Sequence, residues 1–506
     1  MKVVSGLCST FNFRIGVRAP RKGWLCLPVW AKPSSALFLP KRLGRSHHYS
    51  VTMNASQEAQ DVAILQTRVL PVKATNLGQF IVKETKLPLE DWNLELSSSA
   101  DAVHLREAVA RLRESDIPIG FPTETVYGLG ADATRSAAVK GIYRAKQRPS
   151  DNPLIVHIAS LSQLRRLLTP TGQINHDISH DPIPNIYHAL IQRFWPGPLT
   201  IILSNPEGSV LAPEVTAGLS TFGARMPRNL LALALIRLAD VPVAAPSANA
   251  STKPSPTAAE HVLHDLNGRI ELILDGGLCD IGVESTVVDG LSSPPSILRP
   301  GGIGLDQIRS CPGWEETVVG YRDVSEQGVK PRAPGMKYRH YSPKAPVILL
   351  EPGAHVPTMT DLARHLGGRR TLGVVRTKTW PSISGVDDRA AVPPITARAE
   401  PGSHMHDWSR PTPIADLLQE HTVHESIPAE KLSAHDSQSG DFEVWDMNIG
   451  PCTSDVARGL FSALRSLDQK NVDAIIVEGI DEAEGDVAAA VMNRLRKAAE
   501  IKLDHL

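Results

Sequence analysis

The chain has 506 residues and a mass of 54.8 kDa, a length that allows two to four domains of ordinary size. Hydrophobic residues make up 42% and charged residues 21%, which is the composition of a folded globular protein and excludes a largely disordered, collagen-like or coiled-coil chain. No apolar run approaches the roughly 20 residues that a membrane-spanning helix needs.

Charge is unevenly distributed along the chain. The net charge is 53 − 54 = −1, but the first 56 residues hold nine Lys or Arg and no acid, so the remainder stands at 44 − 54 = −10. An acidic body argues against a general nucleic-acid-binding protein, because that binding depends on neutralising phosphates. The five cysteines are widely spaced without a C-x-x-C pair, which argues against a zinc ribbon or a disulfide framework and favours a reducing compartment.

Residues 1–55 combine arginine, serine and apolar residues without any acid, a composition typical of an organelle transit peptide. We expect either a mitochondrial targeting segment or a disordered extension, with Met53 as an alternative start. The expected location is the cytoplasm, together with mitochondria if the long form is targeted.

From about residue 97 to 312, helical and strand patterns alternate, which predicts an α/β domain with a mixed sheet. The expected helices are 101–115, 135–146, 187–195, 229–240 and 257–267. The expected strands are 117–121, 154–159, 199–203, 241–245, 285–289 and 297–299. The polar segment 171–186 is expected to be a surface insertion.

Residues 313–345 are expected to form a linker. Its second half holds no acid and five basic residues, which suggests that it faces an anion: Lys330, Arg332, Lys337, Arg339 and Lys344. A second, smaller α/β domain is expected over 346–505, with strands 347–350, 371–376 and 474–478 and helices 455–467 and 486–500. The Pro-, Ser- and His-rich stretch at about 380–440 is expected to be a mostly disordered loop.

The segment PTETVYGLG, residues 122–130, follows the first expected strand. Hydroxyls at the carboxyl end of a strand, with glycines that let the backbone approach a ligand, suit a small polar substrate, although a threonine-rich turn is the simpler alternative. Residues 128–133 also fit the dinucleotide pattern G-x-G-x-x-A. We discount that fit because no helix starts against the glycines.

Two basic residues, Lys146 and Arg148, stand at the end of an expected helix, held by prolines on the carboxyl side. They can converge on a phosphate chain, although helix-terminal cations often only complement the helix dipole. His157 lies within an apolar strand, where a core histidine would be the default. Its place one strand after the basic pair favours a substrate contact.

Three further motifs carry polar side chains among apolar residues. Arg225 lies in an apolar stretch and must be paired, which a carboxylate ligand would do. Ser247 and Asn249 point to the same side if the backbone is extended, and Thr257 is expected to cap the next helix. The segments ESTVVD and LRPG bring Ser285 and Arg299, and each of these motifs alone is weak.

In this order, however, the motifs PTETVYGLG, KQRPSDNPLIVHI, FWPGPLT, ARMP, APSAN, ESTVVD and LRPG resemble the YrdC family of threonylcarbamoyl-AMP synthases over about 97–312. The segment APGMKYRHYSP, residues 333–343, followed by a second α/β unit, resembles the two-domain subclass of archaea, many bacteria and fungi. The resemblance implies a YrdC-like twisted mixed sheet with flanking helices, plus a smaller Rossmann-like α/β domain.

The resemblance also implies a reaction, in which L-threonine, bicarbonate and ATP give L-threonylcarbamoyladenylate and pyrophosphate, for modification of tRNA beside the anticodon. It implies that threonine or its carbamate is held by Thr125, His157, Arg225, Ser247 and Ser285. It implies that ATP is held by Lys146, Arg148, Asn152, Thr221, Asn249, Thr257, Arg299 and Tyr341. We expect catalysis to rest on Lys146, Arg148 and Arg299.

Residue types agree with this chemistry. A carbamate oxygen is already anionic, so its attack on the α-phosphorus needs aligned anions and neutralised charge rather than a covalent nucleophile. We expect Mg²⁺ to be carried mainly by ATP, without a dedicated protein cage, and the sequence has no Walker A motif. The basic linker is expected to close over the triphosphate.

The expected partners are the small-molecule substrates and a downstream tRNA threonylcarbamoyl transferase complex, with weak tRNA contact and no membrane. An RNA-binding regulatory module is the alternative from another class of function. A carbamoyl-transfer maturation enzyme that shares the YrdC unit is disfavoured, because cysteine-rich zinc modules are missing.

Overall fold

A computed structural model describes residues 65–82, 90, 92–169, 181–321, 340–354, 368, 370–381, 427–436 and 440–503. All of these belong to one compact unit, 63–506. The expected transit segment, the basic linker residues at 330–339 and most of the expected disordered loop lie outside the described residues. Within the described part of the chain, no helix is long and apolar enough to cross a membrane.

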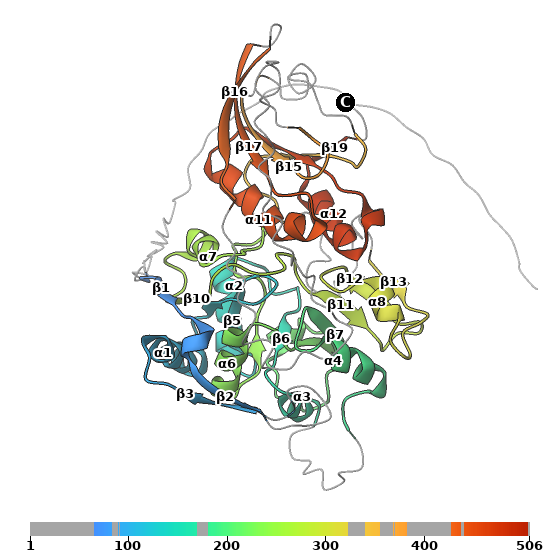
Figure 1. Ribbon diagram of the computed structural model, residues 1–506. Coiled ribbons are helices and arrows are strands. Elements are labelled where there is room, and N and C mark those ends of the chain that lie inside the picture. Colours follow the sequence, from blue (N-terminus) through green and yellow to red (C-terminus); the bar gives the residue numbers. More distant parts are fainter. Residues whose placement is uncertain are drawn as a thin grey trace, which may run out of the picture. The chain divides into compact units, whose positions relative to one another are not determined.

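The larger sheet contains 11 strands among the described residues, in the order β1-β10-β4-β5-β9-β6-β8-β7-β11-β12-β13 (Figure 1). Its strands are β1 (Arg68–Pro71), β4 (Ile119–Phe121), β5 (Gly128–Asp132), β6 (Ile155–His157), β7 (Leu199–Ser204), β8 (Thr221–Arg225), β9 (Val243–Ala244), β10 (Leu272–Asp275), β11 (Thr286–Asp289), β12 (Ser296–Arg299) and β13 (Val318–Val319). The sheet contains parallel pairs, such as β6 with β8, and antiparallel pairs, such as β4 with β5. The expected mixed sheet is confirmed.

Helices flank this sheet, and a separate hairpin is made by β2 (Gly78–Val82) and β3 (Trp92–Leu96). The helices are α1 (Ala100–Glu114), α2 (Ser136–Lys146), α3 (Leu161–Leu168), α4 (His188–Phe194), α5 (Pro213–Thr216), α6 (Leu230–Ala239), α7 (Ala259–Leu266) and α8 (Leu305–Arg309), with 3-10 turns at Ala74–Asn76 and Asn185–Tyr187. Local signals explain their ends. The Ser99 hydroxyl caps α1 by accepting the Ala102 N–H, and Gln147 ends α2 in the left-handed conformation.

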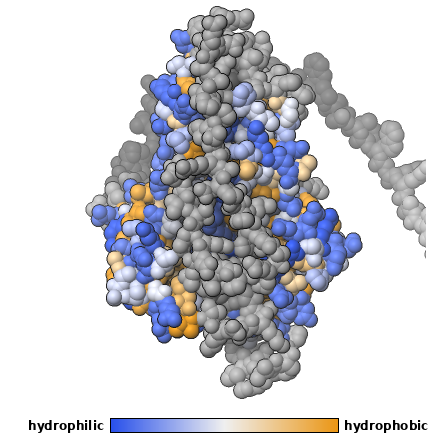
Figure 2. Space-filling model, viewed as in Figure 1, coloured by the Kyte–Doolittle hydropathy of each residue, from blue (hydrophilic) through white to orange (hydrophobic). Residues whose placement is uncertain are grey.

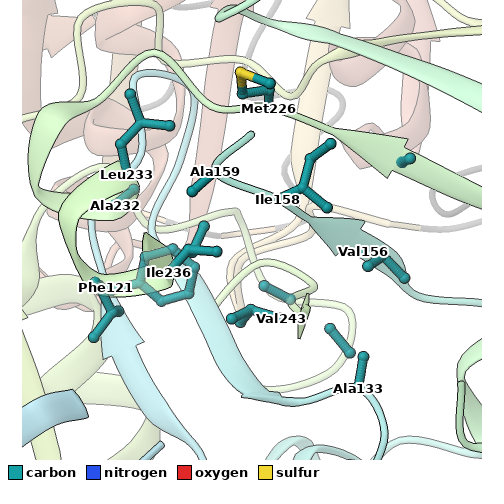
Figure 3. Close-up of a cluster of buried hydrophobic side chains, with 14 of the residues drawn as sticks. Phe121, Ala133, Val156, Ile158, Ala159, Met226, Ala232, Leu233, Ile236 and Val243 are labelled. Atoms are coloured by element: carbon teal, nitrogen blue, oxygen red, sulfur yellow. The ribbon is translucent and has the colours of Figure 1, made fainter. Parts of the chain in front are cut away.

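The hydrophobic core lies between the sheet and these helices. Figure 3 shows Ile236 of α6 beside Phe121 of β4, with Leu233 further along the same helix, while Val156 and Val243 come from neighbouring strands. These side chains are almost completely removed from water. Burying an aliphatic side chain of this size contributes about 1.5–3 kcal/mol each, so the core fixes the sheet whose strand ends carry the polar motifs.

The glycine-rich segment after PTETV forms strand β5 rather than a turn. A Cβ at Gly130 would lie 2.8 Å from a ring carbon of Phe121, and one at Gly128 would lie 3.0 Å from the same ring. The glycines therefore make room for Phe121 in the adjacent strand. As expected, no helix begins at these glycines, since the next helix starts at Ser136.

The second sheet has six strands in the described part of the chain, in the order β16-β17-β15-β18-β14-β19. Its strands are β14 (Val347–Leu350), β15 (Thr371–Arg376), β16 (Glu430–Asp436), β17 (Gly440–Asn448), β18 (Ala474–Glu478) and β19 (Ile501–Leu503). All neighbours are parallel except β16 and β17. Helices α11 (Thr453–Gln469) and α12 (Asp486–Ala498) lie side by side on one face, and a 3-10 turn occupies Glu482–Glu484 (Figure 1).

The expectation of a disordered loop across 380–440 is wrong at its end. Residues 430–436 form β16, which pairs antiparallel with β17 along its whole length. The pairing supplies the backbone hydrogen bonds and cross-strand contacts that the weak local pattern of this segment did not signal. The first domain likewise continues beyond its expected end at residue 312. Strand β13 pairs with β12, and Trp314 is fully buried in the main core.

The outer surface adds little to a functional argument. Figure 2 shows hydrophilic residues over much of the described surface on this face, with smaller hydrophobic areas among them. Exposed large apolar side chains such as Val103 and Leu291 come from separate elements. Scattered surface hydrophobic residues are ordinary in folded proteins, so the polar pocket described next is the feature that points to function.

Candidate active site

A pocket gathers most of the polar motifs at the ends of neighbouring strands. It is lined by Thr123, Thr125, Val126, Gly128, Arg148, Ile155, His157, Arg225, Ala245, Pro246, Ser247, Glu284, Ser285, Arg299, His340 and Tyr341. Of the residues expected to hold threonine, all five line this pocket. Of those expected to hold ATP, Arg148, Arg299 and Tyr341 line it.

The Thr-Glu-Thr segment after β4 organises one wall. The Thr123 and Thr125 hydroxyls lie 2.9 Å apart, and Arg225 Nη1 donates to Thr125 Oγ1 at 2.9 Å. Arg225 Nη2 lies 2.7 Å from a carboxylate oxygen of the buried Glu124. The paired carboxylate that we expected from a ligand is thus supplied by Glu124, because the buried guanidinium needs a counter-charge even without substrate.

Strand pairing places His157 beside Arg225. The two residues are Cα partners in the parallel β6-β8 ladder. Burial, and after it the positive charge of Arg225, lowers the pKa of His157 to about 3. The imidazole is therefore neutral near pH 7, when it can donate or accept a hydrogen bond but cannot contribute positive charge.

Ser285 and Arg299 form a second hydrogen-bonded unit. Arg299 Nη2 donates to the Ser285 carbonyl at 2.8 Å and to the Ser285 hydroxyl at 2.9 Å, and Nε donates to the same carbonyl at 3.0 Å. The Ser285 hydroxyl also lies 2.8 Å from that of Thr200. Burial lowers the pKa of Arg299 to about 10, so the guanidinium remains charged at neutral pH.

Lys146 stands behind the pocket rather than in its lining. It is 2% exposed, and its Nζ donates to the Asn249 carbonyl at 2.7 Å, to Asn249 Oδ1 at 3.3 Å and to the Ser247 carbonyl. The amide of Asn249 in turn donates to the carbonyls of Ala250 and Lys253. Lysine and asparagine therefore fix the loop that presents Ser247.

Ser247 and Asn249 do not share a side of an extended segment. The chain turns between them, because the Asn249 N–H donates to the Ser247 carbonyl at 3.0 Å. Ser247 lines the pocket, whereas Asn249 is completely buried. The extended backbone that we considered does not form.

Arg148 lies just beyond the end of α2. It follows the left-handed Gln147, where its own N–H donates to the Tyr143 carbonyl, and it reaches the pocket lining. Burial lowers the pKa of the Arg148 guanidinium. A guanidinium facing a cavity is suited to an anionic ligand, since its planar donors match phosphate oxygens.

Besides Lys146 and Asn249, three more of the residues expected to hold ATP lie outside the pocket lining. Asn152 is buried, and its carbonyl accepts the Tyr143 hydroxyl at 3.0 Å. Thr221 begins β8 and pairs with Ser204. Neither Asn152 nor Thr221 lines the cavity. The third residue outside the lining is Thr257.

Thr257 does not cap the helix that follows it. Helix α7 begins at Ala259 with Ala258 as its N-cap, and no side chain caps it. His261 Nδ1 accepts the Thr257 N–H at 3.2 Å, so a side chain from inside the helix reaches back to the preceding backbone. This contact from His261 to Thr257 replaces the expected cap, and the position of Thr257 before the helix did not reveal it.

Sequence reasoning missed Glu284 as a pocket residue. Its carboxylate accepts the Ser255 hydroxyl at 2.6 Å and lies 3.1 Å from Arg494 Nε. The positive charges of Arg494 and Arg299 outweigh burial and lower the pKa of Glu284 to about 2. An acidic residue next to Ser285 was visible in the sequence, but its partner lies 210 residues away.

His340 and Tyr341 bring the end of the linker to the pocket. Their rings lie 4.3 Å apart, and Tyr341 packs 5.1 Å from Phe461 of α11. The Tyr341 backbone adopts φ 69°, and the next residue, Ser342, donates its N–H to the Thr252 carbonyl at 2.8 Å. Lys344 is exposed, while the other four basic linker residues lie outside the described residues.

The side chains of the pocket do not form a metal cage. Within the described part of the chain, no group of three or more His, Cys, Asp or Glu side chains is arranged to hold an ion. The pocket carboxylate, Glu284, is already engaged by Ser255 and Arg494. The polar lining instead suits a ligand that brings negative charge of its own.

Fold and site together define an α/β protein with a pocket at its strand ends that three arginines line. A family model described as "Telomere recombination" matches residues 111–301, and one described as "Threonylcarbamoyl-AMP synthase, C-terminal domain" matches 303–500. The chain is 41% identical over 440 residues to the threonylcarbamoyl-AMP synthase of Schizosaccharomyces pombe, covering 83% of this chain and 93% of the relative. It is 41% identical over 417 residues to that of Bacillus subtilis, covering 82% and 98%.

A solved structure is similar over most of the chain. The crystal structure of Pyrococcus abyssi Sua5 complexed with L-threonine matches with a TM-score of 0.59 and 34% identity, covering 86% of this chain and 100% of that one. The chain therefore belongs to the threonylcarbamoyl-AMP synthase family, in the form that carries both the YrdC-like domain and the Sua5 C-terminal domain.

Proposed function

We propose that this chain makes L-threonylcarbamoyladenylate and pyrophosphate from L-threonine, bicarbonate and ATP, for threonylcarbamoyladenosine modification of tRNA. The observation that carries the proposal is the pocket in which three arginines, two serines and neutral His157 converge. Family membership and relatives named threonylcarbamoyl-AMP synthase support the same reaction.

On the amino-acid side, Thr125, His157, Arg225, Ser247 and Ser285 hold threonine or its carbamate. Arg225 is anchored by Glu124 and Thr125, which supports a fixed guanidinium that binds a carboxylate in a defined direction. Neutral His157 supplies a hydrogen bond without adding charge. The Pyrococcus abyssi Sua5 structure is a complex with L-threonine, which supports an amino-acid subsite in this family.

On the nucleotide side, Arg148, Arg299 and Tyr341 contact ATP, while Lys146 and Asn249 support the loop beneath it. Asn152, Thr221 and Thr257 belong to the outer part of the ATP subsite in this proposal. A carbamate oxygen attacks the α-phosphorus, a new O–P bond forms, and pyrophosphate leaves with the electron pair of the broken P–O bond. Arg148 and Arg299 stabilise the charge on the reacting phosphate.

No covalent enzyme intermediate is needed, because the carbamate oxygen is itself the nucleophile. Mg²⁺ would be bound mainly by phosphate oxygens, where it supplies further neutralisation of charge. The chain contributes positioning, donors and exclusion of water, and in this proposal the basic linker, 313–345, closes over the triphosphate.

The product is a reactive mixed anhydride, which fits transfer to a downstream tRNA threonylcarbamoyl transferase complex, with at most weak tRNA contact by this chain. We place the enzyme in the cytoplasm, with a mitochondrial fraction directed by residues 1–55, whose acid-free basic composition motivates the proposal. Fluorescent protein fused after residues 1–55 that stays wholly cytosolic would contradict the mitochondrial fraction.

The test is release of pyrophosphate by the full chain, with threonine and bicarbonate omitted in turn. We expect release only when both are present together with ATP. Release that is unaffected by either omission would indicate simple ATP hydrolysis and contradict the proposal. Salt-sensitive tRNA binding without turnover would favour the RNA-binding alternative.

A further inference from the structure

Glu284 places a negative charge in a pocket that is otherwise built for anions. It lines the same cavity as Arg148, Arg225 and Arg299. It is 7% exposed, so water screens its charge poorly. Without a counter-charge it would oppose the binding of any phosphate or carboxylate in the cavity.

The counter-charge comes from the second domain. Arg494 of α12 has a completely buried side chain, and its Nε donates to Glu284 Oε2 at 3.1 Å. Its Nη1 donates to the Pro300 carbonyl at 2.5 Å, directly after the pocket residue Arg299. A residue far along the sequence thus contacts two segments that form the pocket wall.

Glu284 also joins two other parts of the wall. Its second oxygen accepts the hydroxyl of Ser255, which follows the Ser247–Asn249 loop. Burial is the largest cause that raises the pKa of the Tyr341 phenol, and the charge of Glu284 and a hydrogen bond to Glu284 raise it further. The carboxylate therefore connects the loop after β9, the end of the linker and α12.

We infer that Arg494 is a positioning residue of the adenylation site: it neutralises Glu284 and fixes its carboxylate, so that the pocket retains the positive potential that ATP needs. The inference rests on the proposed function for its substrate. It assigns the second domain a direct electrostatic contribution to the site. Removing one member of a buried ion pair leaves the other uncompensated, which is the expected source of the defect.

The experiment is a double-mutant cycle on the full chain with Arg494→Met and Glu284→Gln. ATP affinity is measured by calorimetry, and pyrophosphate release supplies KM and kcat. We expect Arg494→Met to weaken ATP binding about tenfold or more, with a smaller change in kcat. Glu284→Gln added to Arg494→Met should recover most of that loss, since it removes the unpaired charge.

Arg458→Met is the matched control. Arg458 also reaches from the second domain to the first, where its Nε donates to the Asp280 carbonyl at 3.1 Å, but it does not line the pocket. Thermal unfolding and circular dichroism check that all variants are folded. If Arg494→Met does not fold, Arg494→Lys, which keeps the charge but not the paired donors, takes its place, with an intermediate loss expected.

Two results would overturn the inference. One is ATP affinity for Arg494→Met no weaker than for Arg458→Met, and the other is a double variant whose loss is the product of the two single losses. A wild-type chain that binds ATP but releases no pyrophosphate would contradict the proposed function instead, while the affinity cycle would still decide the role of Arg494.

Discussion

Lys146 and Arg148 show how neighbouring cations take different tasks. Gln147 between them has φ 52°, which ends α2 and turns the chain before Arg148. The Lys146 ammonium donates to carbonyls of the Ser247–Asn249 loop, whereas Arg148 lines the cavity. Lys146 therefore supports the loop, and Arg148 faces the cavity.

Substitution of either residue should lower activity, but only substitution of Lys146 should also lower folding stability markedly. Arg148→Ala is expected to lower kcat/KM for ATP on the order of 10²-fold, like removal of a donor to developing charge, with a stability change within about 1 kcal/mol. Lys146→Met should lower turnover similarly but also cost about 2–4 kcal/mol of folding stability, because buried carbonyl acceptors lose their donor. Pyrophosphate release and denaturant unfolding measure the two effects.

Arg148→Lys is the control for geometry, and it should recover only part of the lost activity because an ammonium lacks the planar donors. Wild-type release in Arg148→Ala would contradict its place in the nucleotide subsite. Unchanged stability in Lys146→Met would contradict the role of Lys146 as a support for the loop.

At the scale of elements, α11 approaches the pocket-bearing part of the chain at a glycine. Gly282 has φ +78°, and a Cβ there would lie 2.4 Å from Arg458 Cα and 2.6 Å from the Ala457 carbonyl oxygen. Backbone atoms of a helix cannot move aside as a flexible side chain can. The turn before Glu284 is therefore set by direct contact with α11.

Gly282→Ala should disturb this contact, and the same loop offers a matched control. Gly277 has φ +89° with no atom within 4 Å of an added Cβ, so Gly277→Ala should cost only the backbone strain, about 1 kcal/mol. Gly282→Ala adds a steric clash and should cost at least about 2 kcal/mol more. Denaturant unfolding of both variants measures the difference.

Pyrophosphate release should fall in Gly282→Ala and stay near the wild-type level in Gly277→Ala. Equal stability losses in the two variants would show that the loop can move away from α11 at no cost. The close approach would then not constrain the turn before Glu284.

Across the whole molecule, the sequence predicted elements best where local pattern and packing agree. The strands 347–350, 371–376 and 474–478 are apolar runs and were placed at their observed ends. Strand β5, by contrast, is Gly-Leu-Gly-Ala-Asp, whose low strand preference is overridden by packing against Phe121. Strand β16 depends on pairing with β17, which local pattern does not contain.

The pocket residues, too, divide into those that the sequence indicated and those that depend on long-range packing. The resemblance that the order of the motifs carries implied a shared site for Thr125, His157 and Ser285, and all three line one cavity in the structure. The partners that set the charge of the cavity were not predictable. Arg494 meets Glu284 across 210 residues, and only the packing of α12 brings them together.

Buried histidines make the stability of the whole molecule depend on pH. Burial is the largest cause that lowers the pKa values of His157, His261 and His340 to about 3, and the charges of Arg225 and Arg465 lower those of His157 and His261 further. All three residues stay neutral in the folded chain, while an unfolded histidine takes up a proton near pH 6.5. Their contribution is therefore fully present above about pH 6.5 and is lost as pH falls toward 3.

We expect the free energy of unfolding to fall by roughly 3.5 kcal/mol per pH unit between pH 6 and pH 5, since each of the three protons taken up contributes about 1.4 kcal/mol per unit at most. Carboxylates with lowered pKa values, such as Glu284 at about 2, lose their contribution only at lower pH. His261→Gln, which keeps an acceptor for the Thr257 N–H, should remove about a third of the slope. Urea unfolding at several pH values measures it, and a slope equal in the variant and the wild-type chain would mean that His261 is protonated in the folded protein.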